Sequence, residues 1–163
     1  MLARGGSDRP YEQIMRSVAE DVERAYALNP AEHQVWRDFF VDANIGWIYL
    51  RRGDDRADQG DLAHALADYE LASLRIKPGS ENAALDLAEA LFKAGATALR
   101  LGELERGERL YGRALDLLRR SGDEFGLGRK VPDAIDALQA LAAEEPSLAP
   151  HVAPIVEALE GYR

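Results

Sequence analysis

The stretch that decides the fold is "AEALFKAGATALRLGELERGERLYGRALDLL", residues 88–118. Its apolar residues recur every three or four positions, which predicts two helices separated by a turn. Glycine nevertheless stands at four places in it, at Gly95, Gly102, Gly107 and Gly112. A glycine inside a helix costs roughly 1 kcal/mol relative to alanine, whereas burying a large apolar side chain contributes roughly 1.5–3 kcal/mol. Glycine and alanine on apolar faces therefore indicate helix backbones that approach closely, with larger side chains buried around them.

The rest of the chain follows the same helical periodicity. Helices are predicted over residues 9–28, 31–52, 61–77, 80–101, 103–120, 132–145 and 150–161. Polar loops are predicted at 53–60, "GDDRADQG", and at 121–130, "SGDEFGLGRK". No segment alternates apolar and polar residues as a strand would. The connections are short, so neighbouring helices should pack antiparallel in an all-α fold.

Two segments of the chain repeat each other. "ALADYELA" at 65–72 and "GERLYGRA" at 107–114 place a small residue, a tyrosine and an alanine at the same spacing. Their tyrosines are Tyr69 and Tyr111, 42 positions apart in the chain. "GDL" and "GEL" precede them at Gly60 and Gly102. An internal repeat of this length predicts a stacked array of helices.

The first helices of the two units align less simply. Matching "IGWIY" at 45–49 to "AGATA" at 94–98 pairs Gly46 with Gly95 and requires a seven-residue extension, "DDRADQG", in the first unit. An earlier set on the 31–52 helix fits the same pattern and leaves its phase open: Trp36, Phe39, Phe40 and Ala43.

These residues resemble the tetratricopeptide repeat (TPR) family, whose pattern is W-x2-L-G-x2-Y, then A-x3-F, then P. The first unit matches at Ile45, Gly46, Tyr49, Ala65, Tyr69, Ala72 and Pro78. The second matches at Leu91, Ala94, Gly95, Ala98, Gly107, Tyr111 and Ala114 but lacks the tryptophan and the proline. A period near 42 with long helices is similar to the repeats of kinesin light chain. The resemblance implies antiparallel helix-turn-helix repeats stacked as a short TPR-like superhelix.

The predicted organisation is one helical domain over 8–163 after a flexible tail at 1–7. Within it we expect a partial unit at 8–30, units at 31–78 and 79–121, and a C-terminal helical pair at 122–163 that caps the stack.

Composition narrows the class of protein. The 163 residues carry a net charge of −9, which argues against nucleic acid as a partner. Cysteine is absent, so disulfides and cysteine-ligated metals are excluded. No apolar run approaches the ~18 residues of a membrane span, so no direct membrane insertion is expected. The first residues lack the apolar core of a signal peptide, and a cytoplasmic location is the expectation.

No pattern in the chain predicts catalysis. His33, His64 and His151 have no metal-ligand spacing. "DDRADQGD" at 54–61 departs from a calcium loop, and no strand precedes "GLGRK" at 126–130 as a phosphate-binding turn requires. We therefore expect no catalytic residue, no metal, no cofactor and no enzymatic activity.

Binding is the function that the resemblance implies, because the first helix of each TPR unit lines a concave groove. The corresponding residues are Arg37, Asn44, Trp47, Arg51, Phe92, Lys93, Ala96 and Arg100. A basic and aromatic groove would suit a peptide with an acidic segment or a C-terminal carboxylate, since arginine offers paired hydrogen bonds. The alternative for the aromatic residues is helix packing, and for the arginines it is plain solvation.

A protein-interaction scaffold is thus the predicted function. Two alternatives remain open at this point. One is a structural module that self-associates as a homodimer. The other is the interaction domain of a larger protein.

Overall fold

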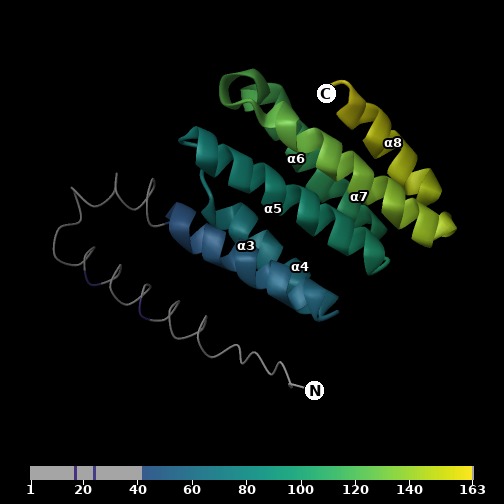
Figure 1. The fold of residues 1–163 in the computed structure, drawn as a ribbon, viewed down its shortest axis with the longest axis horizontal. Helices are drawn as coiled ribbons and strands as arrows, with labels where there is room; N and C mark the ends of the chain where they lie inside the picture. The colour runs from purple at the N-terminus through teal and green to yellow at the C-terminus, as the bar shows by residue number, and fades with distance from the viewer. Residues whose placement is uncertain (1–16, 18–23, 25–41, 163) are drawn as a thin grey trace, which may run out of the picture.

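The computed structural model describes Ser17, Arg24 and residues 42–162 (Figure 1). The expectations for the tail at 1–7 and for Arg37 fall outside these residues, and of the helix at 9–28 and the unit at 8–30 only Ser17 and Arg24 are described, both of them helical. Within residues 42–162, six α-helices follow one another: α3 (Asp42–Asp58), α4 (Leu62–Arg75), α5 (Glu81–Arg100), α6 (Leu104–Phe125), α7 (Val131–Glu144) and α8 (Ala149–Glu160). Two short 3-10 turns flank α7, namely η2 (Leu127–Lys130) and η3 (Pro146–Leu148). Residues 42–162 contain no strand, which confirms the all-α prediction.

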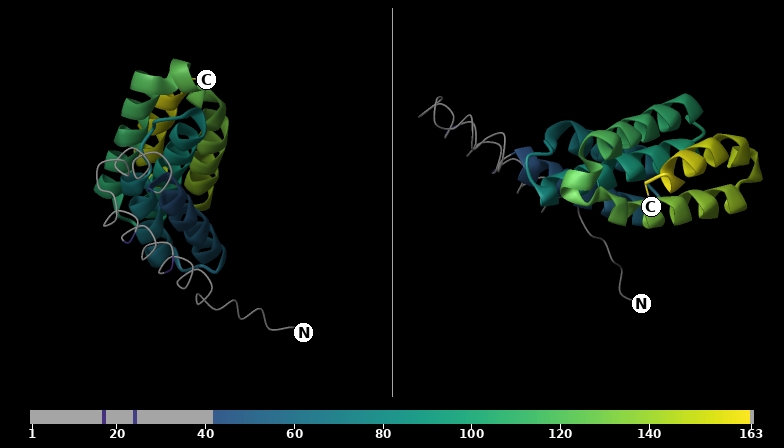
Figure 2. Two further views of the ribbon diagram at one scale, coloured as in Figure 1. Left: turned by 90° about the vertical axis from the view of Figure 1, so that its left-hand side faces the viewer. Right: turned by 90° about the horizontal axis from the view of Figure 1, so that it is seen from above.

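The helices pack as successive pairs, α3 with α4, α5 with α6, and α7 with α8. Figure 1 shows α3, α5 and α7 side by side in that order, and we call the side they share the first-helix face. Helix α4 packs against α5, and α8 lies next to both α6 and α7 (Figure 2). All six helices contribute to one hydrophobic core. The predicted stack of antiparallel helix pairs is therefore present.

The first two pairs are copies that repeat at the interval between Tyr69 and Tyr111. Helix α3 ends at Asp58 and α5 at Arg100, while α4 begins at Leu62 and α6 at Leu104. From the first pair to the second, the end of the first helix and the start of the second helix therefore each recur after the same number of residues as the tyrosines.

The turns within the two pairs repeat as well. Gly60 and Gly102 have φ values of +80° and +76°, a region that glycine enters without the steric cost of a side chain. The amide of Gly102 donates to the carbonyl of Leu99, and the amide of Glu103 donates to that of Ala98, each at 2.9 Å. The same two bonds, also at 2.9 Å, close the turn at Gly60. Both helices therefore end in a Schellman motif.

A tyrosine ring packed on a glycine backbone joins the helices of each of the first two pairs. A Cβ added to Gly95 would lie 2.6 Å from the ring of Tyr111, and one added to Gly53 would lie 2.6 Å from the ring of Tyr69. Gly46, which was aligned with Gly95, faces Ile76 instead. That alignment and its seven-residue extension are therefore wrong. The spacing of the tyrosines holds for the first helices too, because each ring requires a glycine directly opposite it.

The polar segment at 53–60 is also not the loop that was predicted. Helix α3 continues to Asp58, because charged residues of this segment are bonded to other helices rather than to solvent. Arg56 Nη1 donates to Asp68 Oδ2 at 2.7 Å, and the Tyr69 hydroxyl donates to Asp54 Oδ1 at 3.0 Å. The loop predicted at 121–130 is likewise shorter, since α6 continues to Phe125.

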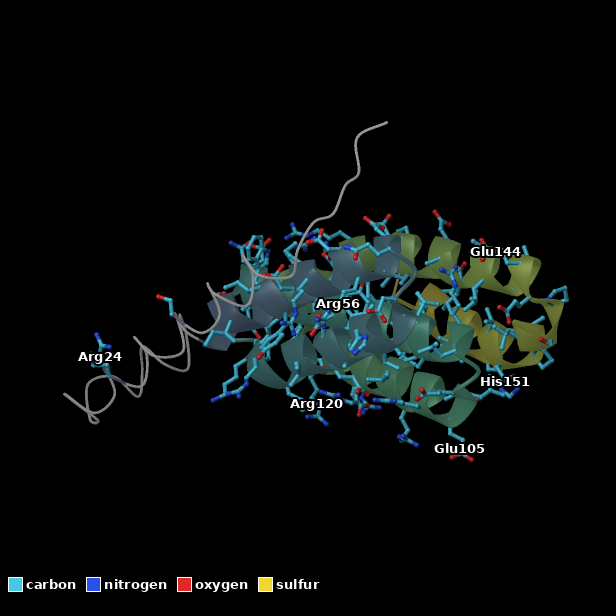
Figure 3. All side chains as sticks on the ribbon, turned by 90° about the horizontal axis from the view of Figure 1, so that it is seen from below. Arg24, Arg56, Glu105, Arg120, Glu144 and His151 are labelled. Atoms are coloured by element: carbon cyan, nitrogen blue, oxygen red, sulfur yellow. The ribbon has the colours of Figure 1, made fainter. Side chains whose placement is uncertain are left out.

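One position of the core is ionic in the first pair and apolar in the second. Asp68 is 1% exposed and accepts hydrogen bonds from Arg52 and Arg56. Figure 3 shows Arg56 within the body of helices, whereas Arg120 lies at the edge. The residues 42 positions after Arg52, Arg56 and Asp68 are Ala94, Ala98 and Leu110, all buried. One backbone arrangement thus accommodates two chemically different interiors.

The tyrosine–glycine contact predicts opposite effects for one substitution at two glycines. Gly95→Ala should lower the free energy of unfolding by about 1–3 kcal/mol, because the methyl group overpacks the Tyr111 ring. Gly112→Ala is the matched control within α6, where a Cβ would contact nothing. It should raise stability by up to about 1 kcal/mol through helix propensity. Urea unfolding of both variants measures the difference, and equal effects would contradict the packing argument.

The ionic cluster predicts that removing one partner is worse than removing all three. Asp68→Ala should cost about 3–5 kcal/mol, because it removes a buried carboxylate that two mostly buried guanidinium groups share. The triple variant Arg52→Ala, Arg56→Ala, Asp68→Leu copies the second pair and should range from neutral to about 4 kcal/mol more stable. Thermal and urea unfolding decide between them. A triple variant as unstable as Asp68→Ala would contradict the equivalence of the two pairs.

Candidate functional site

An open pocket of about 340 Å³ lies on the first-helix face between α5 and α7. We call it the α5–α7 pocket. It is lined by Glu89, Phe92, Lys93, Ala96, Tyr111, Lys130, Asp133, Ala134 and Ala137. Helix α5 contributes four of these residues, and η2 with the first part of α7 contributes another four. The pocket therefore lies between the second and third helix pairs.

The apolar wall of this pocket is built around aromatic rings. The ring centroids of Phe92 and Tyr111 are 6.1 Å apart, a separation typical of interacting aromatic pairs. Phe92 is 6% exposed, so its ring belongs to the core and also borders the pocket. Ala96, Ala134 and Ala137 leave the space beside it open, because their side chains end at Cβ.

An ionic network centred on Glu89 forms the polar wall. Glu89 Oε1 accepts from Arg51 Nη2 at 3.0 Å and from Lys93 Nζ at 2.8 Å, and Glu89 Oε2 accepts from Lys130 Nζ at 2.8 Å. Asp54 also accepts from Arg51 and Lys93, at 2.8 and 2.7 Å. One carboxylate thus connects α3, α5 and η2.

The network changes the acidity of its carboxyl groups. Burial is the largest single influence on Glu89 and raises its pKa, but the hydrogen bonds and charges of Lys130 and Lys93 together outweigh burial and lower the pKa to about 2. The pKa of Asp86 is raised, first by burial and then by the charge of Glu89. Glu89 therefore stays ionised across the physiological pH range.

Tyr111 differs from every other buried polar side chain described. Its residue is 1% exposed, and its hydroxyl is the one buried side-chain polar atom in the described part of the chain without a hydrogen-bond partner. Burial raises the pKa of this phenol, so it stays protonated and remains a donor. A buried hydroxyl without a partner costs about 1–3 kcal/mol.

The residues predicted for the groove fall into three groups. Phe92, Lys93 and Ala96 line the α5–α7 pocket, and Arg51 reaches it through Glu89. Trp47 is 48% exposed, and the Arg51 guanidinium lies 5.7 Å from its ring centroid.

Arg100 is not part of the pocket. Its Nη2 donates to Glu144 Oε2 at 3.1 Å, at the end of α7. Asn44 lies in α3, but its side chain is outside the described residues, and so is Arg37.

Several lining residues were not predicted. Glu89 precedes Lys93 by one helical turn, so the predicted helix could have indicated it. Lys130 comes from a segment predicted as loop, and Asp133, Ala134 and Ala137 come from α7, whose packing against α5 no pattern in the sequence indicates.

Neither a metal site nor a membrane span is found in the described part of the chain. Residues 42–162 hold no group of three or more histidine, cysteine or acidic side chains suited to a metal ion. None of the described helices has the length and apolar character needed to cross a bilayer. The imidazole groups of His64 and His151 pair with single carboxylates, those of Asp61 and Glu108.

Comparison of the chain with protein-family models, with curated proteins and with solved structures finds no match.

The low pKa of Glu89 predicts a loss of stability in acid. A carboxyl group whose pKa falls on folding stabilises the fold above its unfolded pKa of about 4.3 and loses that contribution as the pH falls toward its folded pKa. The free energy of unfolding of wild type should therefore exceed that of Glu89→Gln by about 3 kcal/mol near pH 6. This difference should disappear as the pH falls from 4.5 to 2. Urea unfolding at several pH values measures it. Glu157→Gln, at an exposed site on α8, is the control and should show a much smaller gap.

Proposed function

We propose that this chain is a non-catalytic protein-interaction module of TPR type that binds a peptide segment of a partner on its first-helix face. The observation that carries the proposal is the α5–α7 pocket, which combines an apolar wall with charged side chains on one open surface. Ligand pockets typically pair mainly apolar walls with a few placed polar groups. The two copies of the helix pair support the assignment to the TPR class.

The chemistry of the face favours a partner with acidic groups. Arg51, Lys93 and Lys130 converge there, although the whole chain carries a net charge of −9. Trp47, half exposed beside Arg51, extends the same surface along α3 with an aromatic ring. Aromatic and cationic side chains are typical anchors of binding energy in protein interfaces. An acidic segment or a C-terminal carboxylate of a peptide would fit this combination.

Self-association is a second candidate, and a different surface favours it. Leu71 and Leu74, three residues apart on α4, are 37% and 67% exposed. Exposed leucines on one side of a helix suit contact with a second copy. This surface differs from the α5–α7 pocket, so the two functions can be tested separately.

The experiment that tests peptide binding blocks the pocket without disturbing the fold. Immobilised protein is panned against a displayed library of random twelve-residue peptides, and the affinity of selected peptides is measured by fluorescence anisotropy. Ala137→Trp places a large ring in the pocket from an exposed position and should weaken binding at least tenfold. Ala140→Trp, also exposed on α7 but outside the pocket lining, is the matched control and should bind as wild type does.

Light scattering over a concentration series accompanies this test. A monomer that selects peptides sensitive to Ala137→Trp supports the proposal. A stable dimer that Leu74→Ser separates, with no peptide selected, supports self-association instead.

A further inference from the structure

The two units treat their equivalent tyrosines differently. The hydroxyl of Tyr69 donates to Asp54 Oδ1 at 3.0 Å. The residue 42 positions after Asp54 is Ala96, and the hydroxyl of the equivalent tyrosine, Tyr111, has no partner among the described residues. The second unit therefore has the donor without the acceptor.

The space left by the missing acceptor is open rather than filled. Ala96 and Tyr111 both line the α5–α7 pocket, which has room for several atoms beyond a single water molecule. Buried polar groups nearly always have a hydrogen-bond partner, so a hydroxyl without one indicates a missing group. The pocket would admit such a group from outside the chain.

The cations around the pocket also have protons to donate. Arg51 donates to Asp54 Oδ2, and the residue 42 positions after Arg51 is Lys93. An ammonium group has three N–H donors, of which Lys93 gives two to described carboxylates and Lys130 gives one. Both oxygens of Glu89 already accept from these cations. Lys93 and Lys130 thus have N–H donors that no described carboxylate accepts.

We propose that the α5–α7 pocket takes an aspartate or glutamate side chain of the bound peptide, whose carboxylate occupies beside Ala96 the position that Asp54 occupies in the preceding unit. Resting on the proposed function, this inference names the chemistry of one subsite. The carboxylate accepts hydrogen bonds from the Tyr111 hydroxyl, Lys93 and Lys130.

The three cations around the pocket outnumber the carboxylates to which they are bonded. Arg51, Lys93 and Lys130 pair with Asp54 and Glu89, while Asp86, whose pKa is raised by burial, interacts with Arg51 and Lys130 through charge alone. Asp133 also lines the pocket, but it is exposed, so water and salt weaken its repulsion of a ligand carboxylate.

The experiment first selects peptides from the random library and then tests a variant that carries its own carboxylate at position 96. Peptides selected by wild type should carry an acidic residue at one fixed position, and exchanging that residue for its amide should weaken binding at least tenfold. Ala96→Asp provides the acceptor internally and should weaken binding by a similar factor. Ala140→Asp adds the same charge on an exposed part of α7 and should have little effect.

Tyr111→Phe provides a second and milder test. Without peptide it should be at least as stable as wild type, because the substitution removes a buried hydroxyl that has no partner. It should nevertheless bind the selected peptides at least fivefold more weakly and show a smaller rise in Tm when they are added.

The outcomes separate this inference from the proposed function. Selected peptides without a fixed acidic position, or with affinities unchanged by Ala96→Asp and Tyr111→Phe, overturn the acidic subsite and leave peptide binding intact. A library from which wild type selects nothing overturns both.

Discussion

The contact between a tyrosine ring and a glycine backbone, made once in each of the first two helix pairs, is the constraint on which the structure depends. At Gly53 and Gly95 the ring occupies the volume that a side chain would need. The first helix of a pair must therefore approach the second at one register. This register also aligns the turns at Gly60 and Gly102 and the ends of the helices.

Once the backbone repeats, each pair can use different chemistry at equivalent positions. Asp68 with its two arginines in the first pair corresponds to Leu110 with two alanines in the second. Asp54 corresponds to Ala96 in the same way. The first difference leaves no polar group unpaired in either pair, because leucine and alanine side chains need no hydrogen bonds. The second difference leaves the Tyr111 hydroxyl without an acceptor. The first exchange thus concerns only the packing of the core, whereas the second leaves an unpaired donor at the α5–α7 pocket.

Electrostatics connects the pairs across the first-helix face. Glu89 accepts from cations on α3, α5 and η2, so its charge stabilises the stacking of units as well as the local helix. Its pKa of about 2 reflects the hydrogen bonds and charges of Lys130 and Lys93, which outweigh the burial that raises it. The same lysines border the α5–α7 pocket, and the groups that hold the stack together are therefore also those that a ligand would meet.

The sequence by itself determined the helical class, four of the six described helices to within two residues at each end, and the period of the tyrosines. It could do so because periodicity and turn chemistry act over short stretches of chain. It also indicated Phe92, Lys93 and Ala96, which share one side of a single predicted helix. The pairing of Gly53 with Tyr69, the continuation of α3 to Asp58 and the contributions of α7 to the pocket were decided only by the tertiary structure. These features could not be predicted because each depends on a contact between helices. A charged segment resembles a loop until its partners are known. A hydroxyl can be recognised as unpaired only after the fold has brought its neighbours together.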